Sequence, residues 1–266
     1  MPLHLPSFLP SSAGWQPVSH GESGDAVFRS DDANRYAKIA GPARRKALAQ
    51  ERRRVEWLSK TNIGAPRVLD WIENDDGAAL ILSAVPGIPA SALPAADLLK
   101  AWPSMAETLK ALHGLPVASC PFSRRLADMV ATARDVVGRN AVNPEFLSPQ
   151  DKGRPPAGLL AEIETEAPQR LEQEKADLVI CHGDACMPNF MVDPETLRCT
   201  GLIDLGRLGL ADRHADFALM LANARESWET REQAESARQI LFGINGLTED
   251  DGRLGFYLRL DPLTWG

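Results

Sequence analysis

The chain has 266 residues, of which 44% are hydrophobic and 24% charged, and its formal net charge at pH 7 is -7. This composition is typical of a folded globular protein, and the length is near the size at which one hydrophobic core divides into two. The negative charge argues against non-specific nucleic-acid binding, which needs a basic face, but it is compatible with a cationic small-molecule substrate.

The apolar segments of the sequence are too short to cross a membrane, because none approaches the ~20 residues that a transmembrane helix needs. Residues 1–15 lack a basic segment and contain Pro2, Pro6 and Pro10, so we do not expect a signal peptide. The 4 cysteines are too few for a disulfide framework in a chain of this length. We therefore expect reduced thiols, a cytoplasmic location and no membrane partner.

The N-terminal third is predicted to be rich in strands. Residues 1–19 read as a Pro/Ser-rich lead-in, and the turn HGESGD follows at 20–25. Alternating and β-branched segments then predict strands over 26–30, 35–40, 65–74 and 77–85, with a helix over 42–61. The stretch 85–94 is rich in Pro and Gly and predicts a lobe boundary there.

The remainder of the chain is mainly helical. Apolar residues at helical spacing predict helices over 96–115, 124–137, 158–176 and from 212 onward, with short strands over 178–184, 189–193 and 199–205. The predicted fold class is therefore α+β with two lobes. A small β-rich lobe (1–85) would precede a larger, mainly helical lobe (86–266).

The stretch VICHGDACMPNFMVD, residues 179–193, has the polar spacing of a phosphoryl-transfer site. Asp184 ends a predicted strand, Asn189 precedes the returning strand, and Asp204 ends the next strand. A carboxylate such as Asp184 can accept the proton of an attacking hydroxyl, and Mg²⁺ prefers oxygen ligands such as an amide and a carboxylate. Each residue alone would suit a turn, but together they favour Asp184 as the catalytic base and Asn189 and Asp204 as metal ligands.

Lys38 is the candidate phosphate-binding cation. It lies in the predicted strand 35–40, where alternation turns its side chain away from its apolar neighbours. In the following helix, Glu51 shares an apolar stripe with Leu48 and Val55, at spacings of three and four residues. A carboxylate that faces inward needs a cation, so we expect Glu51 to pair with Lys38, as strand and helix do in kinases.

Two further features have competing interpretations. Ser23 and the backbone amides of the turn 20–25 would suit phosphate binding, although most such turns are only turns. Cys181, His182 and Cys186 invite a zinc interpretation, but Cys181 and His182 are adjacent in a strand and point to opposite faces. We therefore expect His182 to brace the catalytic loop. His113 is expected to be a structural residue at a helix end.

These motifs resemble those of the aminoglycoside phosphotransferase family, whose fold is similar to that of protein kinases. The segments that carry the resemblance are HGDACMPN, IDLGR and the terminal RLDPLTWG, and they come in the order of the family over essentially the whole chain. Within the family, RNAVNPEFL and the terminal segment are similar to the branch that phosphorylates the 3''-hydroxyl of streptomycin.

The resemblance implies roles for individual residues. It implies that Lys38 holds the phosphates of ATP, that the backbone of Ser83 to Val85 contacts adenine, and that Asp216 braces the catalytic loop. It also implies that the C-terminus lines the substrate site, which makes Asp261, Trp265 and Gly266 candidate substrate contacts. The acidic run 162–177 is a weaker candidate for binding the guanidinium groups of streptomycin, because most of its members suit a solvated helix face.

The expected activity is thus the transfer of the ATP γ-phosphate, with Mg²⁺, to streptomycin. One alternative is a small-molecule kinase of the same fold that acts on another aminoglycoside, a sugar amine or an amino alcohol. A second alternative is a nucleotide-binding scaffold without turnover. That alternative would be favoured by a missing base, lysine or metal ligand, and none of these is missing.

Overall fold

The structure is a computed structural model that describes residues 14–18 and 25–266. The chain forms two compact units. The first contains residues 1–87 together with Thr200–Gly206, and the second contains Ile88–Cys199 and Arg207–Gly266. The segment Thr200–Gly206 joins the first unit through bonds such as the one from Leu202 N to the Gly64 carbonyl oxygen, at 2.9 Å.

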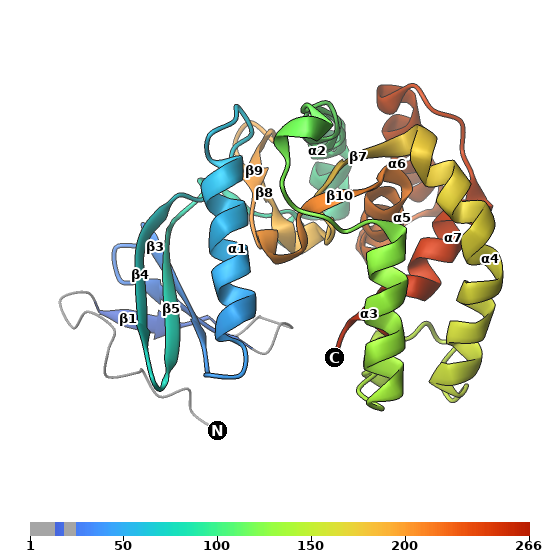
Figure 1. Cartoon of the computed structure of the whole chain (residues 1–266). Helices are drawn as coiled ribbons and strands as arrows, with labels where there is room; N and C mark the ends of the chain where they lie inside the picture. Colours follow the sequence, from blue (N-terminus) through green and yellow to red (C-terminus); the bar gives the residue numbers. More distant parts are fainter. Residues whose placement is uncertain (1–13, 19–24) are drawn as a thin grey trace. The chain divides into compact units, whose positions relative to one another are not determined.

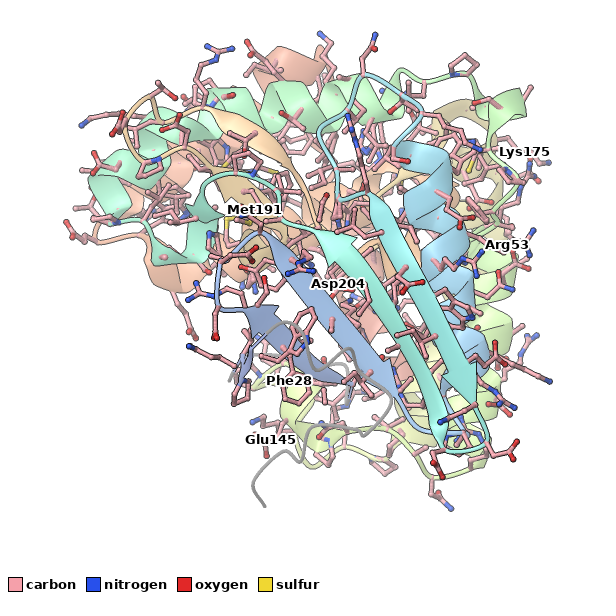
Figure 2. The ribbon with its side chains drawn as sticks, turned by 90° about the vertical axis from the view of Figure 1, so that its left-hand side faces the viewer. Phe28, Arg53, Glu145, Lys175, Met191 and Asp204 are labelled. Atoms are coloured by element: carbon pink, nitrogen blue, oxygen red, sulfur yellow. The ribbon has the colours of Figure 1, made fainter. Side chains whose placement is uncertain are left out.

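The first unit is built on an antiparallel sheet of 5 strands in the order β1-β2-β3-β5-β4 (Figure 1). The strands are β1 (Trp15–Pro17), β2 (Ala26–Ser30), β3 (Arg35–Ala40), β4 (Val68–Asn74) and β5 (Gly77–Ser83). One face of the sheet carries an apolar cluster around Phe28, which Figure 2 labels on β2, with Ala37 and Ile81. Cross-strand pairing places Val27 opposite Lys38, so these two side chains share the other face.

Helix α1 (Arg45–Leu58) packs on the sheet through the stripe that the sequence predicts. Its buried residues are Leu48, Glu51, Val55 and Leu58. The intervening Arg53 is exposed and lies on the outer side of the helix, as Figure 2 shows. The amphipathic spacing of this helix therefore carries one carboxylate, that of Glu51, into the interior.

The second unit is mainly helical. Its α-helices are α2 (Ala95–His113), α3 (Leu126–Gly138), α4 (Pro156–Asp177), α5 (Arg213–Asn223), α6 (Arg231–Asn245) and α7 (Asp251–Leu260). Short 3-10 helices connect them at η1 (Ala90–Ala92), η2 (Val117–Ser119), η3 (Pro144–Phe146), η4 (Met187–Asn189), η6 (Ala224–Ser227) and η7 (Asp261–Thr264). Trp102 of α2 is fully buried, and its indole nitrogen donates to the Ala237 carbonyl oxygen in α6 at 2.7 Å.

Short strands in this unit hold the polar loop. β7 (Leu178–Cys181) pairs antiparallel with β10 (Gly209–Asp212), and β6 (Ile88–Pro89) pairs with β8 (Phe190–Val192). β9 (Cys199–Leu202) and the 3-10 helix η5 (Leu205–Arg207) lie where the chain passes between the units. The loop 182–189 thus leaves β7 and returns into β8, as its sequence predicts.

Most predicted elements are present, but several differ. The strand predicted over 178–184 ends at Cys181, the one predicted over 65–74 begins at Val68, and β6 was not predicted. Residues 15–17 are not a lead-in, because they form β1, where Trp15 packs against the Phe28 cluster. Residues 209–212 form strand β10, which the sequence analysis missed, because pairing with β7 stabilises a segment too short to show alternation. The strand predicted over 199–205 ends at Leu202. No helix within the described residues has the length and apolar character needed to cross a membrane.

Candidate active site

The first unit holds a buried lysine between two carboxylates. Lys38 Nζ of β3 lies 2.7 Å from Glu51 Oε1 of α1 and 2.8 Å from Asp204 Oδ1. The side chains of Lys38 and Glu51 are 11% and 7% exposed, whereas that of Asp204 is 36% exposed. The ion pair expected from the stripe of α1 is therefore present, and Asp204 is the member of this group that solvent reaches most easily.

The charges of this group fix its protonation state. Burial disfavours a charged ammonium, but the nearby Glu51 and Asp204 carboxylates outweigh that effect and raise the pKa of Lys38. Lys38 is therefore a cation at any physiological pH. Asp204 has a φ of 58°, in the left-handed region that non-glycine residues rarely adopt. Such backbone strain persists where the surroundings require it, which is common at functional sites.

The second unit presents Asp184 on the loop between β7 and β8. Asn189 Nδ2 donates to the backbone oxygen of Asp184 at 2.8 Å and to its Oδ2 at 3.0 Å. The Cys186 thiol donates to Asp184 Oδ1 at 3.2 Å, and the Asp184 amide donates to His182 Nδ1, also at 3.2 Å. These bonds orient the Asp184 carboxylate, and the His182 ring accepts the Asp184 amide, while its role as a brace of the loop stays a prediction.

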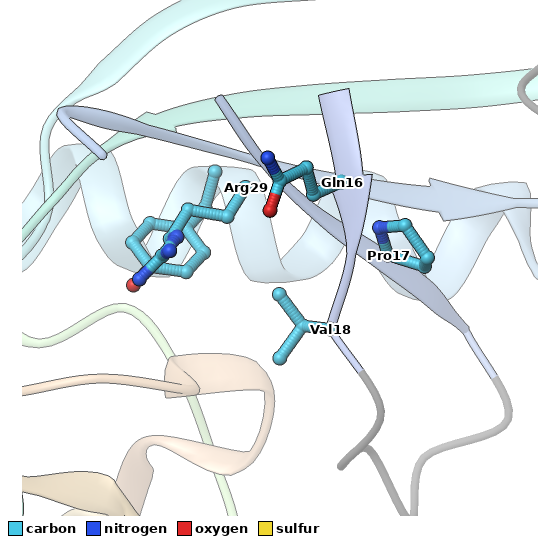
Figure 3. A pocket seen from close by; sticks show the side chains of 5 residues that line it. Gln16, Pro17, Val18 and Arg29 are labelled. Atoms are coloured by element: carbon cyan, nitrogen blue, oxygen red, sulfur yellow. The ribbon is translucent and has the colours of Figure 1, made fainter. Parts of the chain in front are cut away.

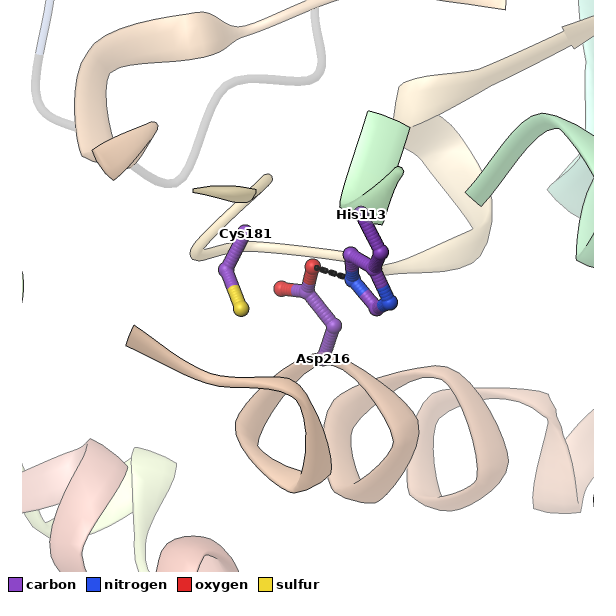
Figure 4. A group of neighbouring side chains, drawn as sticks. All are labelled: His113, Cys181 and Asp216. Carbon is purple, nitrogen blue, oxygen red and sulfur yellow. Dashed lines mark hydrogen bonds and ion pairs between the residues drawn. The ribbon is translucent and has the colours of Figure 1, made fainter. Parts of the chain in front are cut away.

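The buried carboxylate of Asp216 supports the loop that carries Asp184. Asp216 of α5 accepts the amide of His182 at 2.7 Å and that of Gly183 at 2.8 Å. Its Oδ2 also lies 3.0 Å from Nε2 of His113, at the end of α2. Figure 4 shows His113, Cys181 and Asp216 converging from three elements. The bracing contact expected of Asp216 is present, and His113 is part of the same support.

The Asp216 support predicts a specific dependence of stability on pH. Burial alone would raise the pKa of Asp216, but hydrogen bonds from His113 and Gly183 and the charges of His113 and His182 hold it below 3.8. A lowered folded-state pKa gives stability that is present above the unfolded value and lost as pH falls through the folded one. We expect the free energy of unfolding, from urea titrations, to fall below about pH 4 by more in the wild type than in Asp216→Asn. Parallel curves for the two proteins would contradict this assignment.

Among the described residues, the side chains close enough together to share a metal are His113, Cys181 and Asp216, and not the Cys181, His182 and Cys186 of the zinc interpretation. Cys186 donates to Asp184, and the Cys181 thiol lies 3.4 Å from the Asp212 carbonyl oxygen. Burial, with the charges of Asp216 and Asp212, raises the pKa of Cys181 well above its ordinary value of 9.0. Cys181 is fully buried and packs with Val179 and Ala211.

The C-terminal segment is fixed by ion pairs. Asp261 Oδ1 lies 3.0 Å from Nη2 of Arg124 and 3.1 Å from Nη2 of Arg207, and its Oδ2 accepts the Trp265 indole N–H at 3.0 Å. The Arg207 guanidinium stacks 4.1 Å from the centre of the Trp265 ring. Gly266 is exposed at the end of the chain. The structure thus places Asp261 and Trp265 in one cluster.

The acidic run on α4 is occupied by ion pairs and hydrogen bonds within the second unit. Arg134 pairs with Glu164, Lys175 with Glu172, and Arg253 with Asp177, at 2.5, 2.7 and 2.8 Å. Glu174 accepts the Leu126 amide at 2.6 Å, Glu162 pairs with Arg154, and Glu166 pairs with Arg170 and Arg259. Some of these carboxylates hold α4 to α3 and α7, and others pair within α4, so they are engaged inside the unit.

A shallow pocket opens on the first unit, and Figure 3 shows its lining side chains. It is lined by Gln16, Pro17, Val18, Arg29 and Tyr36. Tyr36 lies two residues before Lys38 on β3, and Arg29 pairs with Tyr36 across the strands, so both share the face of Lys38. Tyr36 is not among the site residues predicted from the sequence, although the strand alternation that identifies Lys38 also places Tyr36 on the same face.

The other predicted nucleotide contacts are Ser23 and the segment from Ser83 to Val85. Ser23 lies outside the described residues. The Ser83 amide donates to the Arg67 carbonyl oxygen at 2.9 Å, and the Ala84 amide donates to that of Asn34 at 2.8 Å, which fixes the segment that leads to Val85. Val85 is buried, at 8% exposure. Contact of Ser83 and Val85 with adenine stays a prediction.

The fold is that of a phosphotransferase, and the chain belongs to the phosphotransferase enzyme family, whose model matches residues 14–255. It is 51% identical to the streptomycin 3''-kinase of Streptomyces griseus, over 98% of this chain and 96% of that protein. It is 38% identical to an aminoglycoside 3'-phosphotransferase of Streptomyces fradiae, over 93% and 94%.

A solved structure is similar over nearly the whole chain. An aminoglycoside phosphotransferase from Streptomyces rimosus, in complex with ADP and streptomycin, has a TM-score of 0.90 and 49% identity, covering 96% of this chain and 94% of that one. The predictions of the family, of the two-lobed kinase-like α+β fold and of an enzyme are therefore confirmed. The scaffold alternative is accordingly disfavoured.

Proposed function

We propose that this protein transfers the γ-phosphate of ATP to the 3''-hydroxyl of streptomycin. The observation that carries this proposal is the 51% identity to streptomycin 3''-kinase over 98% of the chain. The chemistry is supported by the described residues, since a buried cation and a carboxylate (Lys38 and Asp204) occur in one unit and an oriented carboxylate (Asp184) in the other. The predicted lobes assign residues 1–85 to the nucleotide and 86–266 to catalysis and substrate. Asp204 departs from that division, because it lies in 86–266 by sequence but belongs to the first unit.

Asp184 is the base of this reaction. The antibiotic hydroxyl attacks the γ-phosphorus, its O–P bond forms as the bond to the ADP oxygen breaks, and Asp184 accepts the hydroxyl proton. The two bonds from Asn189 and Cys186 hold the carboxylate in one orientation before substrate arrives. Positioning of this kind supplies much of the catalysis in phosphoryl transfer.

Mg²⁺ is the metal that these residues suit. Asn189 uses its amide nitrogen to bind Asp184, so its amide oxygen lies on the other side, where a cation would bind. Asp204 supplies a carboxylate, and oxygen donors of this kind are the ligands that Mg²⁺ prefers. Bound Mg²⁺ would neutralise charge on the phosphates. Lys38 would bind phosphate oxygens of the nucleotide, and its ion pair with Glu51 keeps the ammonium in place.

The pocket on the face of Lys38 suits the nucleotide base. The Tyr36 ring lies on the same strand and face as Lys38, so a nucleotide whose phosphates reach Lys38 would bring its base toward that ring. We expect Tyr36→Ala to raise the KM for ATP about 5- to 150-fold, the effect of losing one base–aromatic stack, while kcat at saturating ATP changes little. Tyr36→Phe keeps the ring and is the matched control. Equal KM values for wild type and Tyr36→Ala would place the base elsewhere.

The substrate contacts rest on the resemblance and on the C-terminal cluster. Contacts of Asp261, Trp265 and the exposed Gly266 with streptomycin stay predictions. The cytoplasmic location is likewise a prediction. The 38% identity to an aminoglycoside 3'-phosphotransferase favours, as the second candidate, transfer to a hydroxyl of another aminoglycoside.

The structure of the product tests the proposal. Protein, ATP, Mg²⁺ and streptomycin are incubated, and the product is isolated and examined by mass spectrometry and phosphorus–proton correlation NMR. We expect one added phosphoryl group, coupled to the proton at carbon 3''. Phosphate at another carbon would keep the enzyme class but overturn the assigned hydroxyl.

A further inference from the structure

Four residues of the second unit form a group that we call the tail cluster: Arg124, Arg207, Asp261 and Trp265. Asp261 is 8% exposed and bonds the other three side chains through its two oxygens. Arg124 Nε and Arg207 Nη1 are buried and have no hydrogen-bond partner among the described residues. The cluster thus contains two cations and one carboxylate.

These bonds make Asp261 a poor ligand for a guanidinium group of the substrate. Both oxygens of Asp261 are already engaged by Arg124, Arg207 and Trp265, so a guanidinium group of the substrate would have to compete with these partners. Burial, followed by the charge of Arg207, lowers the pKa of Arg124 to about 10, although the charges of Asp261, Asp184 and Asp216 act in the opposite direction. Replacing either ion pair of Asp261 by one to substrate would take from a half-buried arginine the carboxylate with which it pairs.

The same arginines touch the catalytic loop. Gly183, which precedes Asp184, has a φ of 80°, and a Cβ there would lie 2.2 Å from the Arg207 carbonyl oxygen and 2.8 Å from Arg124 Cδ. Only glycine permits so close an approach. On its other side the Gly183 amide is held by Asp216. The loop is therefore clamped between the Asp216 support and the two arginines.

From these contacts we infer that Asp261 is a positioning residue, which holds Arg124 and Arg207 against Gly183 and so fixes the Asp184 loop to the C-terminal tail. The inference rests on the proposed function only in taking Asp184 as the base. Asp261 then acts on turnover and not on substrate binding. This differs from the sequence-based prediction that Asp261 contacts streptomycin, and the two roles give different kinetics.

The test is a double-mutant cycle of Asp261→Asn and Arg124→Gln in the full chain. Asp261→Asn removes the counter-ion of two cations at nearly constant shape, and we expect kcat to fall about 10- to 100-fold through displacement of the loop. The KM for streptomycin should stay within about threefold of wild type. In the double variant, the side chain introduced by Arg124→Gln retains a carbon at the Cδ position but carries no charge, so one of the two cations that Asp261→Asn leaves without a counter-ion is gone. We therefore expect the kcat of the double variant to be about tenfold higher than that of Asp261→Asn.

A direct role in binding would give the opposite pattern. A KM for streptomycin raised tenfold or more at unchanged kcat, without recovery in the double variant, would overturn the inference. A lower thermal stability of Asp261→Asn with unchanged kcat would also overturn the inference, because a residue that only supports the fold gives that result. Hydrogen exchange of residues 179–190, measured without substrate, should be faster in Asp261→Asn and slower again in the double variant. Hydrogen exchange can be measured without turnover. If the wild type is inactive on streptomycin, the proposed function is refuted, and the exchange of residues 179–190 still tests the role of Asp261.

Discussion

Asp184→Asn should lower kcat about 10²- to 10⁴-fold, the range that a general base contributes. The amide has nearly the same shape as the carboxylate, so the bond from Asn189 to the backbone oxygen of residue 184 remains. It cannot accept the proton of the attacking hydroxyl. Since Lys38 and Asp204 belong to the other unit and are unchanged, the Kd for ATP should stay within about threefold. Steady-state kinetics and ATP titration of the same preparation measure both quantities.

Cys186→Ala is the matched control for this variant. It removes the thiol bond to Asp184 Oδ1, at 3.2 Å, and leaves the base in place. We expect its kcat to fall no more than about tenfold, as suits one weak bond. Near-normal turnover in Asp184→Asn would show that another group accepts the proton. Loss of ATP binding in that variant would show that the substitution disturbs more than the base.

Lys38→Met should lower kcat/KM for ATP at least about 10²-fold, because it removes the cation assigned to the phosphates. It also leaves the Glu51 and Asp204 carboxylates near each other without their counter-ion. Breaking a buried pair in this way costs about 3–5 kcal/mol of stability. In the variant the folded-state pKa of Glu51 is raised, so the lost stability should return as pH falls and the carboxylate binds a proton.

Glu51→Gln separates the two effects of Lys38. The amide can still accept a hydrogen bond from Nζ, and Asp204 still balances the charge, so the fold should be less affected than by Lys38→Met. We expect a higher apparent KM for ATP with a smaller change in the free energy of unfolding. Unfolding titrations in urea at two pH values, with ATP kinetics, measure both. An unchanged KM for ATP in Glu51→Gln would refute the positioning role of the ion pair.

The parts of the site that the sequence predicts are those within one periodic element or one short loop. Glu51 was found because α1 repeats its apolar residues at helical spacing, which leaves one carboxylate on the buried stripe. The sequence predicts that Asp184 and Asn189 reach one site because they lie five positions apart in one loop. In both cases the pattern itself fixes the geometry.

Contacts between distant segments could not be predicted in this way. Arg124 meets Asp261 across 137 positions, and no local pattern marks Arg124 as different from its neighbour Arg125. Asp261 is predicted as a site residue only because it lies in the C-terminal segment. Its arginine partners can be identified only from the folded structure. Strand β10 was missed for a related reason, because its pairing with β7 and not its own sequence stabilises it.

The most direct test of the proposed activity is ADP release by the purified wild-type protein, with ATP and Mg²⁺ and with streptomycin or kanamycin in parallel. We predict turnover with streptomycin and only the background rate with kanamycin. Turnover with kanamycin alone would contradict the assigned substrate, and background rates with both antibiotics would contradict the assigned activity.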